Sequence, residues 1–497
     1  MRWFWALAVF SLAVLGAAAI WMGGLNQDEG WYLYAANLVA AGKVPYRDFF
    51  YTQGPMLPIV YSAFVGIWNA GGLLGARIFT LALGVAGLVF AIALARRLVA
   101  PERRNEVALV VALLLGSNLY HLYYLAIPKT YALAALFVSV GFYVLFVSLD
   151  RCWWLSALAG LALAFAAGTR ISLGALMPVV GLWLLFAKRG KVLTGFCFGG
   201  FAGLTLVYGP FLCDAGARAG LIAAQQYHAA RGGFDITWTV GSLSRLVRWY
   251  LPVFVVLGLG VARMLGTHRT EGTHGTGILL WGFLAVFAVQ MLAPFPYEDY
   301  QVPIMGLLTV YAAVNFVGCG MSSEHRIIGA SEQVRRALLV LGLCFANSFG
   351  SPLLEKWMTN GQDRFWSLKK ESTELAQLRK TAERIEALDP GGKTLLTQDL
   401  YLAVETGRKV PKGLEMGPFA MLSDAEWRRL LMVTAPDECQ VAALSGYTFA
   451  IEPPACAERS SECQLEYWSL LKRNFRLVER VDAFGQNATP LLILKHK

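Results

Sequence analysis

The sequence predicts an all-α polytopic membrane protein that carries a small α/β domain at its C-terminal end. Up to about residue 350, the apolar residues fall into runs of about 17–25 residues, the length at which a helix crosses about 30 Å of hydrocarbon. Charged residues make up only 15% of the 497 residues, against about 25% in ordinary soluble domains. A chain with so little charge and such long apolar runs is an integral membrane protein.

About eleven segments have the length and composition of membrane spans, the last of them being short. An Arg at position 2 followed by an apolar stretch resembles a signal peptide, but the stretch is longer than the usual h-region of about 7–15 residues. We therefore expect an uncleaved first helix. The predicted spans are 4–22, 78–95, 107–127, 131–149, 153–168, 171–187, 192–212, 249–265, 276–293, 301–318 and 337–350.

The distribution of charge predicts the orientation of these spans. The formal net charge is +10, but 20 of the 33 acidic residues follow position 352, so the excess of positive charge lies in the membrane part and does not indicate a nucleic-acid partner. Short loops rich in Lys and Arg stay in the cytoplasm. We expect a multi-pass protein of a bacterial-type inner membrane, with a cytoplasmic N-terminus and with the first loop and the C-terminal tail outside. The basic residues that alternate in this way include Arg96, Arg97, Arg103, Arg104, Arg151, Lys188, Arg189, Lys191, Arg263, Arg269, Arg326, Arg335 and Arg336.

The first outer loop, residues 24–77, has the pattern of an interfacial helix. Apolar and aromatic residues repeat at helical spacing after Asp28, and Gly42 supplies a stop. Such a helix is expected to lie along the membrane surface with its aromatic face in the interface. The apolar segment 56–69 that follows is too short to span comfortably. The helical positions are Trp31, Tyr34, Ala35, Leu38 and Val39.

The composition changes after residue 352, which divides the chain into a membrane module (1–352) and an outer α/β domain (353–497). A charged amphipathic helix is expected over 369–388, and strands over 394–399, 447–452 and 490–495. Cys456 and Cys463 lie in this tail, in an oxidising space if the topology holds, and either pair as a disulfide or stay free.

The segment N-Q-D-E-G-W-Y (26–32) places two adjacent carboxylates directly after the first span. One interpretation is structural, because Asp28 can accept the free amide hydrogens of the first helical turn and acids suit that end of the helix dipole. The other is a general base at the membrane surface. The two interpretations are compatible, because a cap also fixes the position of a carboxylate.

A first span, the D-E pair, a juxtamembrane helix, G-x-x-P-Y-R-D-F-F (42–50) and a Gly-Pro at 54–55 together resemble the GT-C superfamily of membrane glycosyltransferases. More narrowly, the chain is similar to the protein O-mannosyltransferase and lipid A aminoarabinose transferase group. The resemblance covers about residues 1–350 and is sharpest over 26–55. It implies that Asp28 is the catalytic base and that Glu29 is its acidic neighbour in the catalytic loop.

The chemistry of such a transfer fits the expected topology. No nucleotide sugar is present outside the cytoplasm, so the donor is expected to be a polyprenyl-phosphate sugar and the acceptor a lipid, a glycan or a protein hydroxyl. A base must take the proton of the acceptor hydroxyl, and cations must stabilise the departing phosphate. A single base with direct displacement implies inversion at the anomeric carbon.

Two cations at the expected outer ends of spans are candidates for binding the donor phosphate. Lys129 lies between the third and fourth predicted spans, and Arg170 between the fifth and sixth. The alternative is that both snorkel to lipid headgroups. The resemblance favours Arg170 slightly, because relatives carry a basic residue at the start of that span. Arg77 is a weaker candidate.

The segment P-F-P-Y-E-D-Y-Q-V-P (294–303) offers Tyr297 and Tyr300 as further contacts to the carrier phosphate or the sugar. The alternative, which we favour from sequence, is an interfacial aromatic belt with Glu298 and Asp299 as two solvated acids. Where similar proteins often carry an acid in the second outer loop, this chain has Pro128-Lys129-Thr130. We therefore expect no cofactor and a metal-independent mechanism; the sequence leaves a divalent metal open without indicating one.

Two other classes of protein share this hydropathy. A flippase or transporter for lipid-linked sugars should show charged or broken segments near the midplane of the bilayer, whereas here the spans are nearly free of charge. A polysaccharide polymerase or ligase handles similar donors, but the D-E pair after the first span argues against it.

Overall fold

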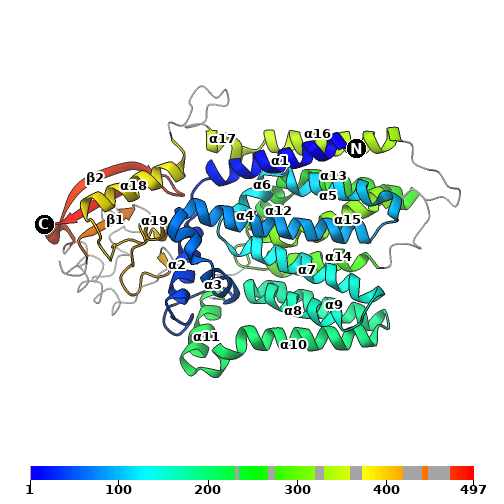
Figure 1. Cartoon of the computed structure of the whole chain (residues 1–497), viewed down its shortest axis with the longest axis horizontal. Coiled ribbons are helices and arrows are strands. Elements are labelled where there is room, and N and C mark those ends of the chain that lie inside the picture. Colours follow the sequence, from blue (N-terminus) through cyan, green and yellow to red (C-terminus); the bar gives the residue numbers. More distant parts are fainter. Residues whose placement is uncertain are drawn as a thin grey trace.

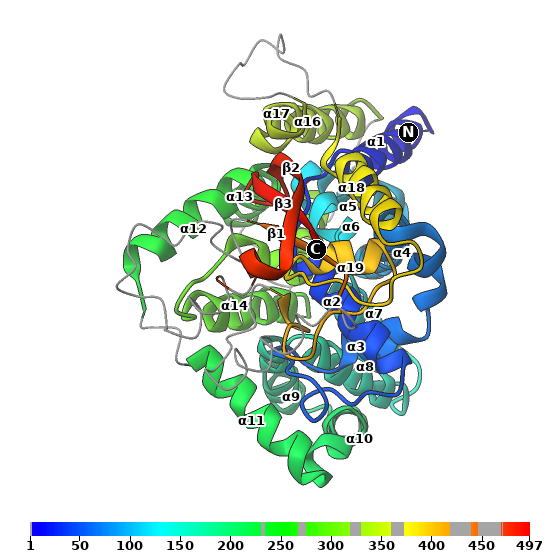
Figure 2. The ribbon, with the colours of Figure 1, turned by 90° about the vertical axis from the view of Figure 1, so that its left-hand side faces the viewer.

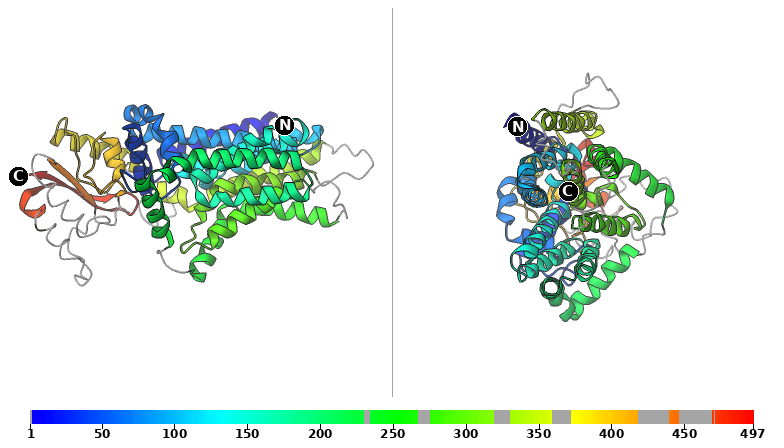
Figure 3. Two further views of the ribbon diagram at one scale, coloured as in Figure 1. Left: turned by 90° about the horizontal axis from the view of Figure 1, so that it is seen from below. Right: turned by 90° about the vertical axis from the view of Figure 1, so that its right-hand side faces the viewer.

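The computed structural model describes residues 2–229, 234–266, 275–318, 330–358, 372–417, 439–445, 469 and 471–497. A long bundle of helices occupies most of the molecule, and a small sheet with two helices lies at one end of the bundle (Figure 1). The view from below shows the same arrangement, with the two chain termini toward opposite ends of the long axis (Figure 3). The all-α membrane part with a small C-terminal α/β part is the predicted fold class.

The described residues contain five helices that are long and apolar enough to cross a membrane, which confirms a multi-pass membrane protein. Three pairs of helices, each bent at a short break, pass the same test together, and three shorter apolar helices accompany them. The predicted number of eleven spans stays a prediction. The five are α1 (Arg2–Trp21), α4 (Val65–Arg97), α7 (Thr130–Asp150), α10 (Gly190–Cys213) and the run of η3 (Glu298–Ile304) with α15 (Met305–Gly318).

The bent pairs and the shorter helices complete the bundle. The first pair is η1 (Pro101–Arg103) and α5 (Arg104–Gly116) with α6 (Leu119–Ala126), bent by 70°. The second is α12 (Ile236–Trp249) with α13 (Leu251–Gly266), bent by 81°, and the third is α16 (Ala330–Phe349) with α17 (Pro352–Met358), bent by 45°. The shorter apolar helices are α8 (Leu155–Thr169), η2 (Ile171–Ala175) continued by α9 (Leu176–Phe186), and α14 (Gly277–Met291); α11 (Ala215–Ala229) follows α10.

Two predicted spans differ from the structure. The segment 107–127 bends after α5 because Asn118 starts a new helix there, its side chain accepting the backbone N–H of His121 at 3.0 Å. The segment 78–95 is only part of α4, which has 33 residues and a kink at Gly72 (φ 59°). The apolar segment 56–69 forms α3 (Met56–Ser62) and the beginning of α4.

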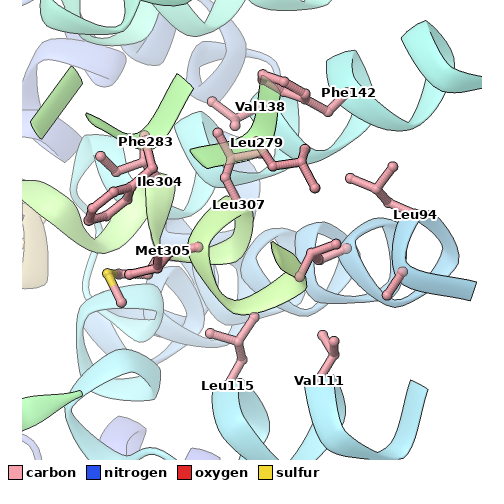
Figure 4. Packing of buried hydrophobic residues seen from close by; sticks show 14 of the residues in the cluster. Leu94, Val111, Leu115, Val138, Phe142, Leu279, Phe283, Ile304, Met305 and Leu307 are labelled. Atoms are coloured by element: carbon pink, nitrogen blue, oxygen red, sulfur yellow. The ribbon is translucent and has the colours of Figure 1, made fainter. Parts of the chain in front are cut away.

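The bundle core lies between α4, α5, α7, α14 and α15, where apolar side chains from five helices interdigitate (Figure 4). Helices in a bilayer gain little from the hydrophobic effect against lipid, so close packing carries more of their association. Glycines allow the closest approach: a Cβ on Gly199 of α10 would lie 1.8 Å from the carbonyl oxygen of Ala157 in α8. The core residues in view include Leu94, Val111, Leu115, Val138, Phe142, Leu279, Phe283 and Leu307.

The first loop forms α2 (Gln27–Ala40) at the sheet end of the bundle. Asn26 and Glu29 form a capping box, in which the Asn26 side chain accepts the N–H of Asp28 at 3.0 Å and Glu29 Oε1 accepts the N–H of Asn26 at 2.9 Å. The expected helix is therefore correct. The expectation that its aromatic face lies in the membrane interface is wrong, because Trp31 and Tyr34 are buried within the protein, at 3% and 5% exposure.

The C-terminal tail packs on α2 and buries Tyr34, while the ring of Trp31 packs on Tyr51 of the first loop, with ring centres 5.5 Å apart. In the tail, α19 (Leu400–Glu405) packs so closely on α2 that a Cβ on Gly30 would lie 2.3 Å from the backbone nitrogen of Tyr401. The hydroxyl of Tyr34 also accepts the backbone N–H of Val410 at 2.9 Å. The aromatic face of α2 thus packs in a protein core and not in lipid.

The tail contains a three-stranded antiparallel sheet of order β1-β3-β2, formed by β1 (Val441–Ser445), β2 (Phe475–Phe484) and β3 (Thr489–His496). Figure 2 looks onto this end, with the sheet and α18 (Glu374–Leu388) toward the viewer. The predicted helix over 369–388 and strand over 490–495 are correct for the part that is described. Residues 394–399 form only isolated bridges; 447–452, Cys456 and Cys463 lie outside the described residues, and the boundary at 352 stays a prediction.

Candidate functional site

Asp28 lies in the first turn of α2 with its carboxylate 24% exposed. Its Oδ2 forms an ion pair with Lys129 Nζ at 2.7 Å, and its Oδ1 accepts the indole N–H of Trp31 at 3.0 Å. Burial by itself would raise the pKa of Asp28, but the charge and hydrogen bond of Lys129, with the indole and the charge of Arg170, hold that pKa below its ordinary value. Asp28 is therefore an ionised carboxylate with a fixed orientation.

Lys129 reaches Asp28 from the short turn between α6 and α7, where it is the residue before Thr130 begins α7. The side chain is 8% exposed, and its ammonium contacts a second carboxylate, Asp299, at 3.3 Å. The rings of Tyr124 and Tyr131 lie at 5.7 and 5.0 Å from Nζ and present their faces to the cation. Lys129 therefore does not snorkel to solvent.

Asp299 is one of two acids that we expected to be solvated, and for this residue the expectation is wrong. Its side chain is 10% exposed, because η3 returns into the bundle and directs it between Lys129 and the hydroxyl of Tyr131, which donates to Oδ2 at 2.8 Å. Glu298 next to it faces the other way and pairs with Arg245 at 3.0 Å.

Arg170 follows α8 directly and precedes η2, which places its guanidinium between two aromatic rings. The guanidinium carbon lies 5.0 Å from the ring centre of Tyr131 and 4.6 Å from that of Tyr300. Its Nη1 donates to Thr130 Oγ1 at 3.3 Å, and its buried Nε has no partner among the described residues. Among the described residues no carboxylate lies within salt-bridge distance of Arg170, so its positive charge is available to an anionic ligand.

Arg170 and Tyr300 line a cavity of about 220 Å³ at this position. The loop 42–55 forms one wall because Gly54 packs against α8, where a Cβ on Gly54 would lie 2.1 Å from the carbonyl oxygen of Gly168. A second, apolar cavity of about 310 Å³ shares Ile171 and Gln225 with the first and is otherwise lined by Ala167, Gly174, Leu204, Tyr208 and Leu221. The remaining lining of the first is Thr52, Gln53, Ser172, Ala293, Pro294 and Phe295.

Glu29 lies apart from this cavity. Its carboxylate is fully buried and accepts two hydrogen bonds from Arg77, from Nη2 at 2.6 Å and Nε at 2.7 Å. Arg77 also donates to the carbonyls of Ile20, Gly23 and Gly24, where the chain leaves α1. The pair joins α1, α2 and α4 behind the site.

The structure thus brings together four of the six sequence-predicted residues: Asp28, Lys129, Arg170 and Tyr300. Tyr297 is 41% exposed and packs on Trp238 and Tyr300 without lining either cavity.

Sequence reasoning missed Asp299 and Tyr131 as members of the same cluster. Asp299 adjoins the candidate Tyr300 in the proline-bounded segment 294–303, and this neighbour is the signal that could have found it. Nothing in the sequence distinguishes Tyr131 from other aromatic residues of the spans.

The described residues contain no group of three or more His, Cys, Asp or Glu side chains that could hold a metal ion. Two carboxylates do meet at the site, and Lys129 occupies the position between them. Independence from metal stays a prediction of the sequence.

Comparison with solved structures identifies the architecture. The chain is similar to ArnT from Cupriavidus metallidurans bound to undecaprenyl phosphate, with a TM-score of 0.61, 13% identity, and coverage of 98% of this chain and 97% of that one. It is also similar to the Archaeoglobus fulgidus oligosaccharyltransferase tethered to an acceptor peptide, with a TM-score of 0.51, 11% identity, and coverage of 98% and 74%.

Both of these structures belong to the GT-C superfamily, so this chain has the GT-C fold that the sequence motifs predicted. No protein-family model matches the sequence, and no curated protein matches it. The likeness to the two solved structures, at 11–13% identity, establishes the fold.

Proposed function

We propose that this chain, which has the GT-C fold, transfers a sugar from a polyprenyl-phosphate donor to a lipid, glycan or protein acceptor on the outer face of the inner membrane. The observation that carries the proposal is the presence at one site of an ionised Asp28, with 24% of its side chain exposed, and of Arg170, which lines a cavity. A base and an anion-binding cation at one site are the two groups that displacement of a phosphate requires.

In the proposed step, Asp28 accepts the proton of the acceptor hydroxyl. The hydroxyl oxygen forms a bond to the anomeric carbon while the bond from that carbon to the phosphate oxygen breaks, and its electron pair leaves with the carrier phosphate. Arg170 stabilises that developing charge, and its stacking between Tyr131 and Tyr300 fixes the plane of its donors. Direct displacement inverts the anomeric carbon, and the 24% exposure of Asp28 lets the proton return to solvent.

The apolar cavity supports a lipid-linked donor. It adjoins the cavity of Arg170 through Ile171 and Gln225, so an isoprenoid chain in the apolar cavity would present its phosphate to the guanidinium in the cavity of Arg170. The similar ArnT structure holds undecaprenyl phosphate, and the similar oligosaccharyltransferase holds an acceptor peptide. These ligands support a lipid-phosphate donor and a separate acceptor in this chain also.

The proposed test uses the full chain reconstituted in lipid with a panel of polyprenyl-phosphate sugars and candidate acceptors. Mass spectrometry should detect the carrier phosphate freed of its sugar and an acceptor heavier by that sugar. A flippase would move the donor between leaflets and leave the sugar–phosphate bond intact, and that outcome would overturn the proposal.

A further inference from the structure

We infer that Lys129 and Asp299 are positioning residues for the proposed base: Asp299 is a standing counter-ion that keeps Lys129 in place when Asp28 takes up a proton. This inference rests on the proposed function. It gives Lys129 a role different from binding the donor phosphate, and it assigns a role to Asp299, which no motif indicated.

The geometry shows one ammonium shared by two carboxylates. Lys129 Nζ lies 2.7 Å from Asp28 Oδ2 and 3.3 Å from Asp299 Oδ2, with ring faces of Tyr124 and Tyr131 on its other sides. The three groups come from α2, the turn before α7, and η3, so tertiary structure alone assembles them. An ammonium has three donors, and two of these already have anionic partners.

The second carboxylate matters because a buried base with a single cationic partner leaves that cation unpaired when the base is protonated. When Asp28 accepts a proton it becomes neutral, and a buried ammonium with no other partner would then be left without a counter-charge, which is costly. Asp299 remains as its partner through that step, anchored by the hydroxyl of Tyr131 at 2.8 Å. Asp299 also draws the ammonium partly away from Asp28, so the base is ionised but not fully neutralised.

Other charged and titratable groups also surround Asp28, Lys129 and Asp299; Tyr120 and Tyr250 interact with Asp299. Arg170 faces Asp28 from the end of α8, and Tyr32, Tyr123 and Tyr300 interact with it or with Lys129. Glu298 is directed to Arg245, and Glu29 is paired with Arg77. Asp299 is therefore the second anion in direct contact with Lys129 within the described part of the chain.

Two substitutions should move the acid limb of the pH–rate profile in opposite directions. Lys129→Met removes the cation and leaves Asp28 beside Asp299, so the limb should move to higher pH, by about one to three units for a lost opposite charge at this distance. Asp299→Asn removes the second carboxylate, so that the charge of Lys129 acts on Asp28 alone and the acid limb should move to lower pH. The value of kcat on the plateau should also fall, because a weaker base accepts the proton. Asp299→Glu should restore the wild-type profile.

Glu298→Gln is the matched control, because it neutralises the adjacent acid that pairs with Arg245 and not with Lys129. Its acid limb should coincide with that of the wild type. The inference is overturned if Lys129→Met raises the KM for the donor and leaves the acid limb in place, since Lys129 would then bind phosphate. Shifts in the same direction for the Lys129 and Asp299 variants would also overturn it.

A measurement without turnover separates this inference from the proposed function. Infrared spectroscopy of the purified full chain can follow the band of the protonated Asp28 carboxyl as the pH is lowered. This band is identified by its absence from Asp28→Asn. The band should appear at higher pH in Lys129→Met and at lower pH in Asp299→Asn than in the wild type. Failure to release sugar from any donor would overturn the proposed function, whereas an unmoved band would overturn the inference about Lys129 and Asp299.

Discussion

Arg77 and Glu29 form a fully buried, two-bond ion pair between α4 and α2, with distances of 2.6 and 2.7 Å and no exposure of either side chain. The same Arg77 binds three carbonyls where the chain leaves α1, and Glu29 also accepts the N–H of Asn26. The pair therefore fixes the start of α2 relative to two helices of the bundle, and Asp28 is the residue next to it.

Glu29→Gln should destabilise the protein without removing the chemistry of the site. The amide leaves the charge of Arg77 buried and uncompensated, and breaking a buried pair in this way costs about 3–5 kcal/mol. Thermal unfolding in detergent measures the loss, and Glu102→Gln, at an exposed position, serves as the control. A Glu29→Gln variant with wild-type melting and no transfer would instead place Glu29 in the chemistry.

Asp28→Asn should abolish transfer while leaving the protein folded, because only the carboxylate can accept a proton. Stability should fall little, because the cap of α2 is formed by Asn26 and Glu29 and does not use this side chain. Asp48→Asn is the matched control: Asp48 is a carboxylate of the same loop that accepts the N–H of Val44 at 2.8 Å, and it should retain activity. Turnover by Asp28→Asn at the wild-type rate would remove Asp28 as the base.

Arg170→Ala should weaken use of the donor more than it changes the dependence on the acceptor. A buried charge-assisted contact contributes about 1.5–3 kcal/mol, or about ten- to a hundredfold in donor efficiency. Arg170→Lys should rescue only in part, because it keeps the charge and loses the planar guanidinium that stacks between Tyr131 and Tyr300. A donor titration measures both variants; equal efficiency of both with the wild type would contradict the phosphate role.

The alternation of basic loops predicts that the tail lies outside, with 96–104 and 188–191 in the cytoplasm. Alkaline-phosphatase and fluorescent-protein fusions at about residues 190 and 360 test this orientation. The fusion at 190 should fluoresce, and the fusion at 360 should show phosphatase activity. A cytoplasmic result for the tail would place Asp28 on the side of nucleotide sugars and contradict a donor presented outside.

Asp399 of the tail should make stability depend on pH. Burial raises its pKa to about 6, although the hydroxyl of Tyr401 donates to it at 2.9 Å. A raised carboxyl pKa favours folding below the unfolded value near 4 and loses this contribution as the pH rises through about 6, an effect of about 3 kcal/mol at most.

The melting temperature of the wild type should therefore fall between pH 4 and 7 by more than that of Asp399→Asn, measured in the same buffers. Parallel curves for the two proteins would show that Asp399 titrates normally. Because Tyr401 packs on Gly30 of α2, the same transition should also loosen the support of the helix that carries Asp28.

The sequence by itself determined the membrane class, the helix of the first loop and the position of Asp28 at its start. These features depend on local properties: the length of apolar runs, the spacing of residues on one helix face, and the capping residues Asn26 and Glu29. Arg170 and Tyr300 were candidates from sequence, because each adjoins a predicted span at the expected outer side, but snorkelling to headgroups and an interfacial aromatic belt remained as alternatives.

The tertiary structure alone decided how the charges pair. Asp28, Lys129 and Asp299 are separated by more than a hundred positions from one another in the chain, so no local pattern links them. Only the packing of α2, α7 and η3 brings both carboxylates within 3.3 Å of the Lys129 ammonium. Glu29 and Asp28 are adjacent, yet consecutive helical residues point in different directions, so Glu29 faces Arg77 in the core and Asp28 faces Lys129. The burial of Tyr34 likewise required the tail to fold back onto α2, and that of Trp31 involves Tyr51 of the first loop; hydropathy indicates neither contact.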